Sequence, residues 1–221
     1  MTIWIVIPAY NEEKQIGRVI AGLFEHGWHN VVVVDDNSSD NTIVVARKSG
    51  ALVVHHVLNR GQGAALRTGD ELALAMGADV IVHFDGDEQF DPGDVKGAVD
   101  YLQEKGLGAV LGSKMLDNRS QIPWLKKLLI IPISRVINLM LTAAWLSDAH
   151  NGFRVLTRAT AEKIIITQDG MAHNSEIIGK IKKNGIKFAE FPVKVVYNEY
   201  GQGVGGGVKI LRDWILSVFI R

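Results

Sequence analysis

Two carboxylates separated by a single residue follow an apolar run in the segment 79–92, DVIVHFDGDEQFDP. Residues 80–84 are mostly branched or aromatic, which predicts a central strand buried on both faces. While the backbone stays extended, Asp85 and Asp87 leave the same side of that strand, and Gly86 between them permits a close approach. The spacing therefore predicts two acids that converge on one point at the end of a buried strand.

Two converging carboxylates repel each other unless one is protonated or a cation lies between them. Ligands that offer only oxygen suit Mg²⁺ or Mn²⁺, and Gln89 adds a neutral oxygen nearby. We therefore predict a metal site of Asp85, Asp87 and Gln89, whose remaining coordination positions would take a substrate diphosphate. The alternative is a solvated acidic turn after a buried strand, because Asp-x-Asp is a short motif.

Short apolar runs alternate with helical apolar spacing through the first half of the chain. Strands are expected at residues 3–7, 31–34, 52–54, 80–84 and 109–111, with helices between them. This alternation predicts a mostly parallel α/β sheet flanked by helices, and such sheets bind ligands at the carboxyl ends of their strands. The loops after the first four strands are rich in acid or glycine, so we expect them to meet at that edge.

The third of these loops, NRGQGAA, opens a predicted helix. Its glycines, Gly61 and Gly63, permit a tight turn. The loop lacks both the Gly-x-Gly-x-x-Gly spacing and a Gly-Lys-Ser/Thr ending, which argues against an ordinary dinucleotide or ATP site.

Size and composition fit one folded unit, since the chain has 221 residues, of which 47% are hydrophobic and 22% charged. It has no cysteine, which excludes thiolate chemistry, and its start, MTIWIVIPAY, does not resemble a secretory signal, so we expect a cytoplasmic protein. The net charge is zero, but residues 1–100 carry −8 and residues 101–221 carry +8. An acidic half suits metal and sugar hydroxyls and a basic half suits phosphate or an anionic membrane, with chance segregation of charge as the alternative.

The second half contains two apolar segments with basic residues nearby. In segment 121–147 the uncharged runs are too short to cross a bilayer, and Pro132 and Arg135 interrupt them. Segment 208–221 places apolar side chains at helical spacing among Lys and Arg. We expect amphipathic helices at a membrane interface; a buried helical hairpin or a dimer face is the alternative for the first segment, and docking on the core for the second.

Five motifs occur in order along the chain: IVIPAYNEE, VVVVDDNSSDNT, NRGQGAALRTG, HFDGDEQFDP and NGFRVLTR. In this combination the chain resembles glycosyltransferase family 2 with a GT-A fold, and it is most similar to polyprenyl-phosphate sugar synthases of the dolichol-phosphate mannose synthase type. The resemblance covers residues 3–200. It implies one Rossmann-like GT-A domain over residues 1–221, with a nucleotide-sugar half at 1–115 and an acceptor half at 116–221.

The resemblance also implies roles for individual residues. The implied donor-binding set is Pro8, Tyr10, Glu12, Asp36, Gly63, Asp85, Gly86, Asp87 and Lys114. The implied catalytic set is Asp87, Lys114, Arg135, Arg154 and Arg158, and the implied metal ligands are Asp85, Asp87 and Gln89. Lys114 ends a Gly-Ser-Lys tripeptide where the family has Gly-Ser-Arg, so a point charge replaces a bidentate fork. For each arginine taken singly, a structural salt bridge is the alternative.

The implied reaction is a metal-dependent, inverting transfer of a sugar from a UDP- or GDP-sugar to a polyprenyl phosphate, dolichyl or undecaprenyl, by a peripheral enzyme on the cytoplasmic face of the membrane. A phosphate oxygen is already ionised near neutral pH, so this acceptor needs no strong base.

A polysaccharide or protein hydroxyl is the alternative acceptor, and it would need a carboxylate base, for which Asp148 and Glu176 are the candidates. A third hypothesis is a non-catalytic nucleotide-sugar-binding or membrane-scaffold protein. The sequence leaves open the sugar, the nucleotide and the oligomeric state, and it indicates no nucleic-acid partner.

Overall fold

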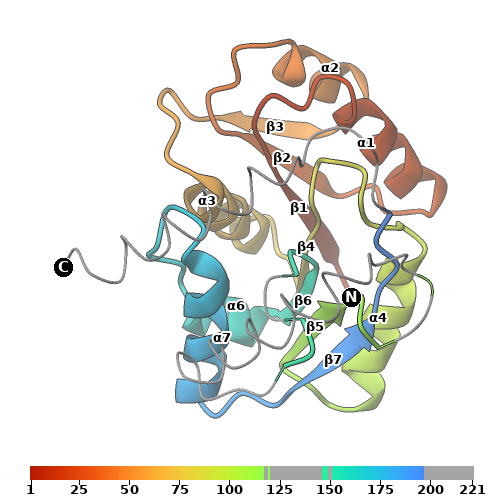
Figure 1. The fold of residues 1–221 in the computed structure, drawn as a ribbon, viewed down its shortest axis with the longest axis vertical. Helices are drawn as coiled ribbons and strands as arrows, with labels where there is room; N and C mark the ends of the chain where they lie inside the picture. The colour runs from red at the N-terminus through yellow and green to blue at the C-terminus, as the bar shows by residue number, and fades with distance from the viewer. Residues whose placement is uncertain (117–118, 120–145, 149–150, 197–221) are drawn as a thin grey trace, which may run out of the picture.

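The computed structural model describes residues 1–116, 119, 146–148 and 151–196, and a seven-stranded sheet lies at its centre (Figure 1). The strand order is β3-β2-β1-β4-β6-β5-β7. The strands are β1 (Ile3–Ala9), β2 (Val31–Asp35), β3 (Leu52–His55), β4 (Val80–His83), β5 (Ala109–Ser113), β6 (Arg154–Thr157) and β7 (Phe188–Pro192). β6 runs antiparallel to its neighbours β4 and β5, whereas the other adjacent pairs are parallel.

Helices cover both faces of the sheet, which gives three layers. On one face, α1 (Ile16–Glu25), α2 (Thr42–Lys48) and α4 (Asp94–Glu104) share a core with alternate residues of β1 and β2. On the other face, α3 (Gln62–Ala75), α6 (Arg158–Lys163) and α7 (His173–Lys183) share a second core with the intervening residues. Because strand side chains alternate in direction, a continuous apolar run such as β2 supplies both cores at once.

The predicted fold class is confirmed, and the five strands predicted within residues 1–111 begin and end within two residues of the expected bounds. β6 is not predicted from the sequence, because its residues RVLT include only two apolar ones, Val155 and Leu156, between Arg154 and Thr157. Its antiparallel direction matters for the site, since it reverses which end of the NGFRVLTR motif faces the carboxyl edge of the sheet.

The two segments predicted to form amphipathic helices, 121–147 and 208–221, lie outside the described residues except for 146–147. The expected position of Arg135 lies there too. Among the helices that the structure does describe, none is both long and apolar enough to cross a bilayer.

Gly69 lets α3 pack directly on β1, and this close contact gives a test of the fold. A Cβ at Gly69 would lie 2.2 Å from Val6 Cγ1, whereas a Cβ at Gly179 in α7 would meet nothing within 4 Å. We expect Gly69→Ala to lower the free energy of unfolding by about 1–3 kcal/mol, because the helix must move off the sheet. Gly179→Ala should raise it by up to about 1 kcal/mol through helix propensity. Urea denaturation measures both values, and effects of the same sign would contradict this account.

Candidate active site

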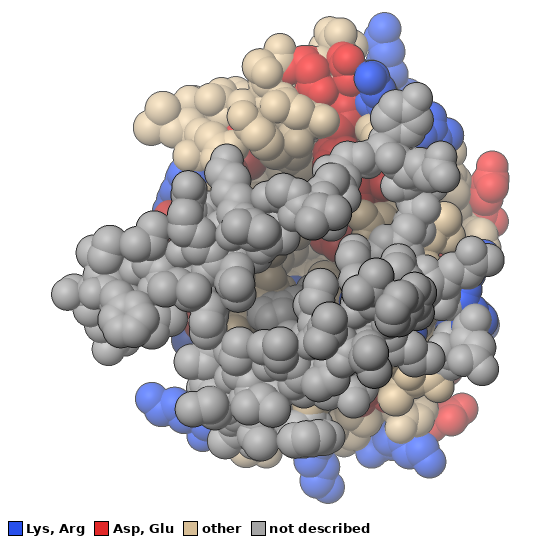
Figure 2. Space-filling view, in the orientation of Figure 1, with Lys and Arg blue, Asp and Glu red and all other residues tan. Residues whose placement is uncertain are grey.

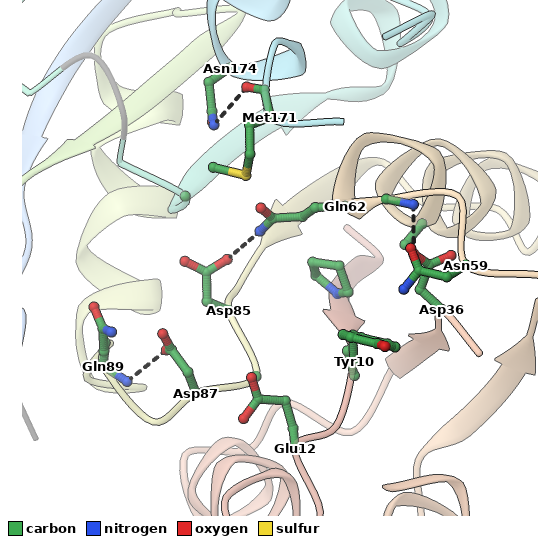
Figure 3. Close-up of a pocket in the computed structure, with 16 residues that line it drawn as sticks. Tyr10, Glu12, Asp36, Asn59, Gln62, Asp85, Asp87, Gln89, Met171 and Asn174 are labelled. Carbon is green, nitrogen blue, oxygen red and sulfur yellow. Dashed lines mark hydrogen bonds between the residues drawn. The ribbon is translucent and has the colours of Figure 1, made fainter. Parts of the chain in front are cut away.

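A cavity of about 550 Å³ opens where β1, β2, β3 and β4 end (Figure 3). Its lining consists of Pro8, Ala9, Tyr10, Glu12, Asp36, Asn59, Gly61, Gln62, Ala65, Asp85, Gly86, Asp87, Gln89, Gly152, Met171 and Asn174. All the residues of the predicted donor-binding set line it except Gly63 and Lys114. The loops that the sequence placed at one sheet edge therefore do meet there.

Aromatic packing holds the acidic loop that follows β4. Phe84 before the loop and Phe90 after it both contact Phe153 edge-on, with ring centroids 6.2 and 5.7 Å apart. The two rings also contact each other at 5.6 Å. All three are buried, so both ends of the loop are anchored in the core beneath the cavity.

Inside the loop, Glu88 has a positive φ of 65° and its carboxylate is paired with Arg18 of α1 at 2.7 Å. The turn brings the backbone N–H of Gln89 to Asp87 Oδ1 at 3.1 Å. The carboxylate of Asp87 is thereby turned toward the cavity, as Figure 3 shows.

Three carboxylates face one another across this cavity, and their proximity perturbs them. Burial and the nearby Asp87 raise the pKa of Asp85 to about 7, against the opposing effects of Arg154 and Gln62. Burial, Asp87 and other neighbouring acids raise the pKa of Glu12 to about 7, and burial also raises the pKa of Asp87. Ionising all three is therefore unfavourable, and a bound cation would relieve that cost.

Asp85, Asp87 and Gln89 all line the cavity, so the predicted metal ligands are brought together. Within the described residues, no three Asp, Glu or His side chains form a complete metal site by themselves. Two carboxylates and an amide oxygen fit a divalent cation that keeps several positions for waters or substrate oxygens, as Mg²⁺ commonly does.

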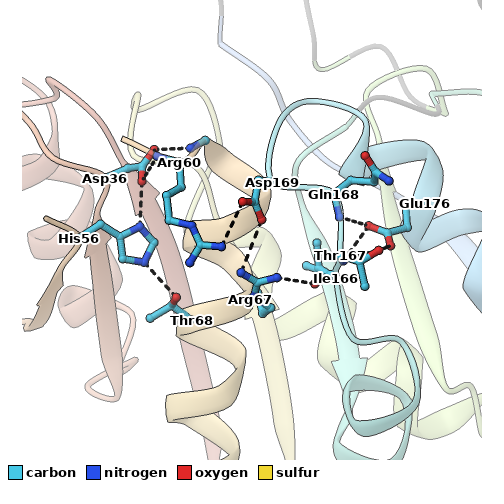
Figure 4. A network of polar contacts seen from close by, with 11 residues as sticks. Asp36, His56, Arg60, Arg67, Thr68, Ile166, Thr167, Gln168, Asp169 and Glu176 are labelled. Carbon is cyan, nitrogen blue, oxygen red and sulfur yellow. Dashed lines mark hydrogen bonds and ion pairs between the residues drawn. The ribbon is translucent and has the colours of Figure 1, made fainter. Parts of the chain in front are cut away.

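Asp36 lines the cavity, but its carboxylate is bound to the glycine-rich loop and to His56 (Figure 4). It accepts hydrogen bonds from the backbone N–H of Arg60 at 3.0 Å and of Gly61 at 2.6 Å. Its third partner is Nδ1 of His56 at 2.8 Å, and the other ring nitrogen of His56 contacts the Thr68 hydroxyl. Asp36 thus fixes the glycine-rich loop beside the cavity.

The glycine-rich loop docks on a segment from the second half of the chain. A Cβ at Gly63 would lie 2.0 Å from the carbonyl oxygen of Gln168, and one at Gly61 would lie 2.5 Å from that of Asp169. The Gly63 N–H donates to the Asp169 carbonyl at 2.8 Å, while the Asp169 carboxylate pairs with Arg67 at 3.5 Å (Figure 4). Gly63 therefore permits a backbone contact between the two halves and does not line the cavity, and its donor contact stays a prediction.

Lys114 follows β5 and does not line the cavity. Its ammonium group contacts both carboxylate oxygens of Asp148, at 2.8 and 2.7 Å, and the two side chains are 22% and 9% exposed. Asp148 also accepts from Asn151 at 2.9 Å. Glu190 of β7 holds the preceding residue, Ser147, through its backbone N–H and hydroxyl. Lys114 therefore has a fixed carboxylate partner next to the cavity.

The two arginines of the NGFRVLTR motif lie at opposite ends of β6. Arg154 is at the cavity end and is only 1% exposed, so it does not reach the cavity surface. Arg158 donates to the carbonyl oxygens of Leu74 and Ala78, both at 2.9 Å, and pairs with Glu162. The predicted catalytic role of Arg158 is corrected, because this side chain holds the end of α3 at the far edge of the sheet.

Glu176, one of the two candidate bases, also lies away from the cavity. Its carboxylate accepts from the backbone N–H groups of Thr167 at 3.0 Å and Gln168 at 2.9 Å, and it pairs with Lys180 at 2.7 Å. It therefore fixes the loop before α7, and the prediction of a base role at Glu176 is corrected.

The cavity also contains residues that the sequence analysis did not assign: Asn59, Gln62, Gly152, Met171 and Asn174. Gln62 donates to Asp85 Oδ1 at 3.1 Å, and its place between two glycines of the turn was the available signal. Gly152 touches the other oxygen, since a Cβ there would lie 2.3 Å from Asp85 Oδ2. Met171 and Asn174 have no local sequence signal, because a loop and a helix N-terminus bring them in from a distance.

A largely parallel sheet with paired acids and a glycine turn at its carboxyl edge defines an α/β protein that binds its ligand at that edge. The model of glycosyl transferase family 2 matches residues 4–165, so the chain belongs to this family and is a glycosyltransferase. The non-catalytic hypothesis is therefore set aside.

Two relatives align over nearly the whole chain. An uncharacterized protein of Methanocaldococcus jannaschii is 38% identical over 97% of this chain and 91% of its own length. A UDP-N-acetylglucosamine–dolichyl-phosphate N-acetylglucosaminyltransferase of Methanococcus voltae is 29% identical over 94% of this chain and 91% of its own.

The fold is also shared with a solved structure. Glucosyl-3-phosphoglycerate synthase from Mycobacterium tuberculosis, crystallised with Mn²⁺ and UDP-glucose, aligns with a TM-score of 0.73. The alignment covers 98% of this chain and 77% of that one at 20% identity, so it shows the fold alone.

The contact between the glycine-rich loop and the 168–169 backbone generates a prediction. Gly63→Ala should push the two apart and expose the amides of Gly63 and Ala64, which both donate to the Asp169 carbonyl. We expect faster hydrogen exchange at these amides and a loss of about 1–3 kcal/mol in the free energy of unfolding. Gly170→Ala is the matched control, because its Cβ would meet nothing within 4 Å. Unchanged exchange in Gly63→Ala would show that the close contact is not required.

Proposed function

We propose that this glycosyltransferase moves a sugar from a UDP- or GDP-linked donor to a polyprenyl phosphate. The observation that carries the proposal is the distribution of acids around the cavity. Among the described residues, every carboxylate that lines it, Glu12, Asp36, Asp85 and Asp87, comes from the first half of the chain. The described second half contributes Gly152, Met171 and Asn174, none of which can act as a base. An ionised phosphate is an acceptor that needs no base.

On the donor side, Asp85, Asp87 and Gln89 would hold Mg²⁺ or Mn²⁺. When bound, the cation offsets negative charge on the diphosphate leaving group. The cluster of acids with raised pKa values supports a cation here. Further support comes from the structural neighbour, which was crystallised with Mn²⁺ and UDP-glucose and with Mg²⁺ and UDP.

On the acceptor side, Lys114 would bind the phosphate. Its side chain is 22% exposed, and its partner Asp148 also accepts a hydrogen bond from Asn151, the residue before Gly152 of the cavity lining. An arriving phosphate can share the ammonium with Asp148, since Lys has three donors. The M. voltae relative is named for a dolichyl-phosphate acceptor, and the structural neighbour was crystallised with phosphoglyceric acid, so both are associated with phosphate-bearing molecules.

The proposal extends to the membrane. A polyprenyl chain resides in a bilayer, so the enzyme would work at the cytoplasmic face, with the apolar segments 121–147 and 208–221 at the interface and Arg135 near the acceptor phosphate. Apart from Leu146, which is buried in the second core, and Ser147, these residues lie outside the described part of the chain, and their role rests on sequence.

Donor and metal binding can be tested without an acceptor. With Mn²⁺ present, a UDP- or GDP-sugar should raise the melting temperature of the chain, because a ligand that binds only the folded state stabilises it by mass action. Asp87→Asn should abolish most of this shift. Asp100→Asn is the matched control, since Asp100 is exposed on α4 and pairs only with Lys96 within the described contacts. A full shift in Asp87→Asn, or one that does not depend on Mn²⁺, would contradict the proposed site.

Product formation with undecaprenyl phosphate tests the acceptor directly, and two variants separate the phosphate and hydroxyl readings. If phosphate is the acceptor, Lys114→Met should raise its KM about tenfold or more, while Asp148→Asn keeps kcat within about tenfold of wild type. If a hydroxyl is the acceptor, Asp148→Asn should instead lower kcat by about 100-fold or more through loss of the base. Failure to form a lipid-linked sugar with any UDP- or GDP-sugar would refute the proposal.

A further inference from the structure

Asn174 is the one polar side chain among the three residues that the described second half contributes to the cavity lining. It lies in the first turn of α7 and is 3% exposed. In Figure 3 it lies with Met171 on the side of the cavity opposite Glu12. Within the described residues, no hydrogen bond joins its side chain to the donor-binding loops of the first half, so its position requires another explanation.

A buried guanidinium fixes how the Asn174 amide is turned. Nη2 of Arg154 donates to Asn174 Oδ1, and Nη1 of Arg154 donates to the carbonyl oxygen of Gly152 at 3.4 Å. A guanidinium has only donors, so the group that faces it must be the amide oxygen. The amide nitrogen of Asn174 consequently points away from Arg154, and the usual ambiguity between oxygen and nitrogen does not arise.

The amide nitrogen of Asn174, Nδ2, has one hydrogen without an acceptor among the described contacts. Nδ2 of Asn174 carries two hydrogens, and one is directed at the carbonyl oxygen of Met171, 3.3 Å away. Among the described contacts the second hydrogen has no acceptor, and because Asn174 lines the cavity, this hydrogen is available to an oxygen atom there. The first half surrounds the cavity with acids, whereas Asn174 places a neutral donor at the opposite side. This is the polarity needed to recognise a hydroxyl, carbonyl or phosphate oxygen.

We propose that Asn174 donates a hydrogen bond from Nδ2 to a substrate oxygen beyond the diphosphate, and that Arg154 is the positioning residue that orients this donor. The inference rests on the proposed function for the placement of the diphosphate at Asp85 and Asp87. The substrate oxygen belongs either to the donor sugar or to the acceptor phosphate, and the two sources are distinguished by experiment.

The variants Asn174→Asp and Asn174→Ala both remove the N–H donor, and the alanine does so without adding a negative charge. An aspartate keeps the oxygen that accepts from Arg154, but it replaces the N–H that faces the cavity with a second oxygen. Isothermal titration in Mn²⁺ would compare UDP-glucose, UDP-N-acetylglucosamine and GDP-mannose with UDP and GDP. If Asn174 contacts the sugar, the affinity for the nucleotide sugar falls about tenfold or more, while that for the parent nucleotide is unchanged.

The control is Asn184→Asp at the other end of α7, where the amide donates to the Lys180 carbonyl at 2.8 Å and is exposed. If Asn174 instead contacts the acceptor, nucleotide-sugar affinity is kept and the KM for undecaprenyl phosphate rises about tenfold or more. The inference is overturned if Asn174→Asp leaves both values as in wild type, or if it weakens UDP or GDP as much as the nucleotide sugar. Failure of the proposed function is distinct, because it appears as absence of lipid product in wild type, and the donor titration needs no acceptor.

A comparison of substrate affinities tests whether Arg154 orients Asn174. Arg154→Lys keeps a positive charge but has no fork to reach both Gly152 and Asn174. It should lose the same substrate affinity as Asn174→Ala, and the double variant should lose no more than Asn174→Ala alone. Additive losses, or a lower melting temperature with unchanged affinity, would show that Arg154 is only structural. Should Arg154→Lys not fold, the Asn174 variants still decide the inference.

Discussion

Repulsion between carboxylates at one edge of the sheet is the constraint on which this structure depends. Glu12 follows β1 and Asp85 follows β4, and these strands are parallel neighbours in register, with Ile5 opposite Val82. Parallel neighbours end at the same edge, so both acids meet Asp87 in a partly buried cavity. Protons or a cation must compensate for the accumulated charge.

Such an unfavourable cluster persists because the surrounding structure holds it in place. Phe84 and Phe90 anchor the acidic loop on Phe153, which belongs to the second half of the chain. The same segment brings Gly152 against Asp85, where a larger residue would displace the carboxylate. The second half therefore shapes the cavity mainly through apolar rings and backbone, while the first half supplies the charge.

The sequence predicts what is local and misses what depends on strand direction. Asp85, Asp87 and Gln89 follow one apolar run, so spacing alone is enough to bring them together. Arg154 and Arg158 are four residues apart in one motif, yet β6 carries them to opposite edges of the sheet, and four residues contain no signal for an antiparallel strand.

Gly63 and Asn174 are two further residues whose contacts the sequence does not predict. A glycine in a turn predicts freedom of the backbone, but the sequence does not show that the Gln168 carbonyl fills the space beside Gly63. Asn174 has no motif of its own, and its significance comes from the buried Arg154 beneath it. Both depend on how the two halves of the chain pack together, which the pattern of apolar residues does not encode.

The contacts of Asp148 bear on the choice of acceptor. A general base must be free to take a proton from the acceptor, but this carboxylate already binds the Lys114 ammonium through both oxygens and accepts from Asn151. Ser147, the residue before Asp148, is held by Glu190. Moving Asp148 away from Lys114 would therefore break several hydrogen bonds. An anion that brings its own negative charge needs only to share the ammonium, and no bond to Asp148 has to break. These contacts support the phosphate acceptor that we propose over a hydroxyl that Asp148 would have to deprotonate.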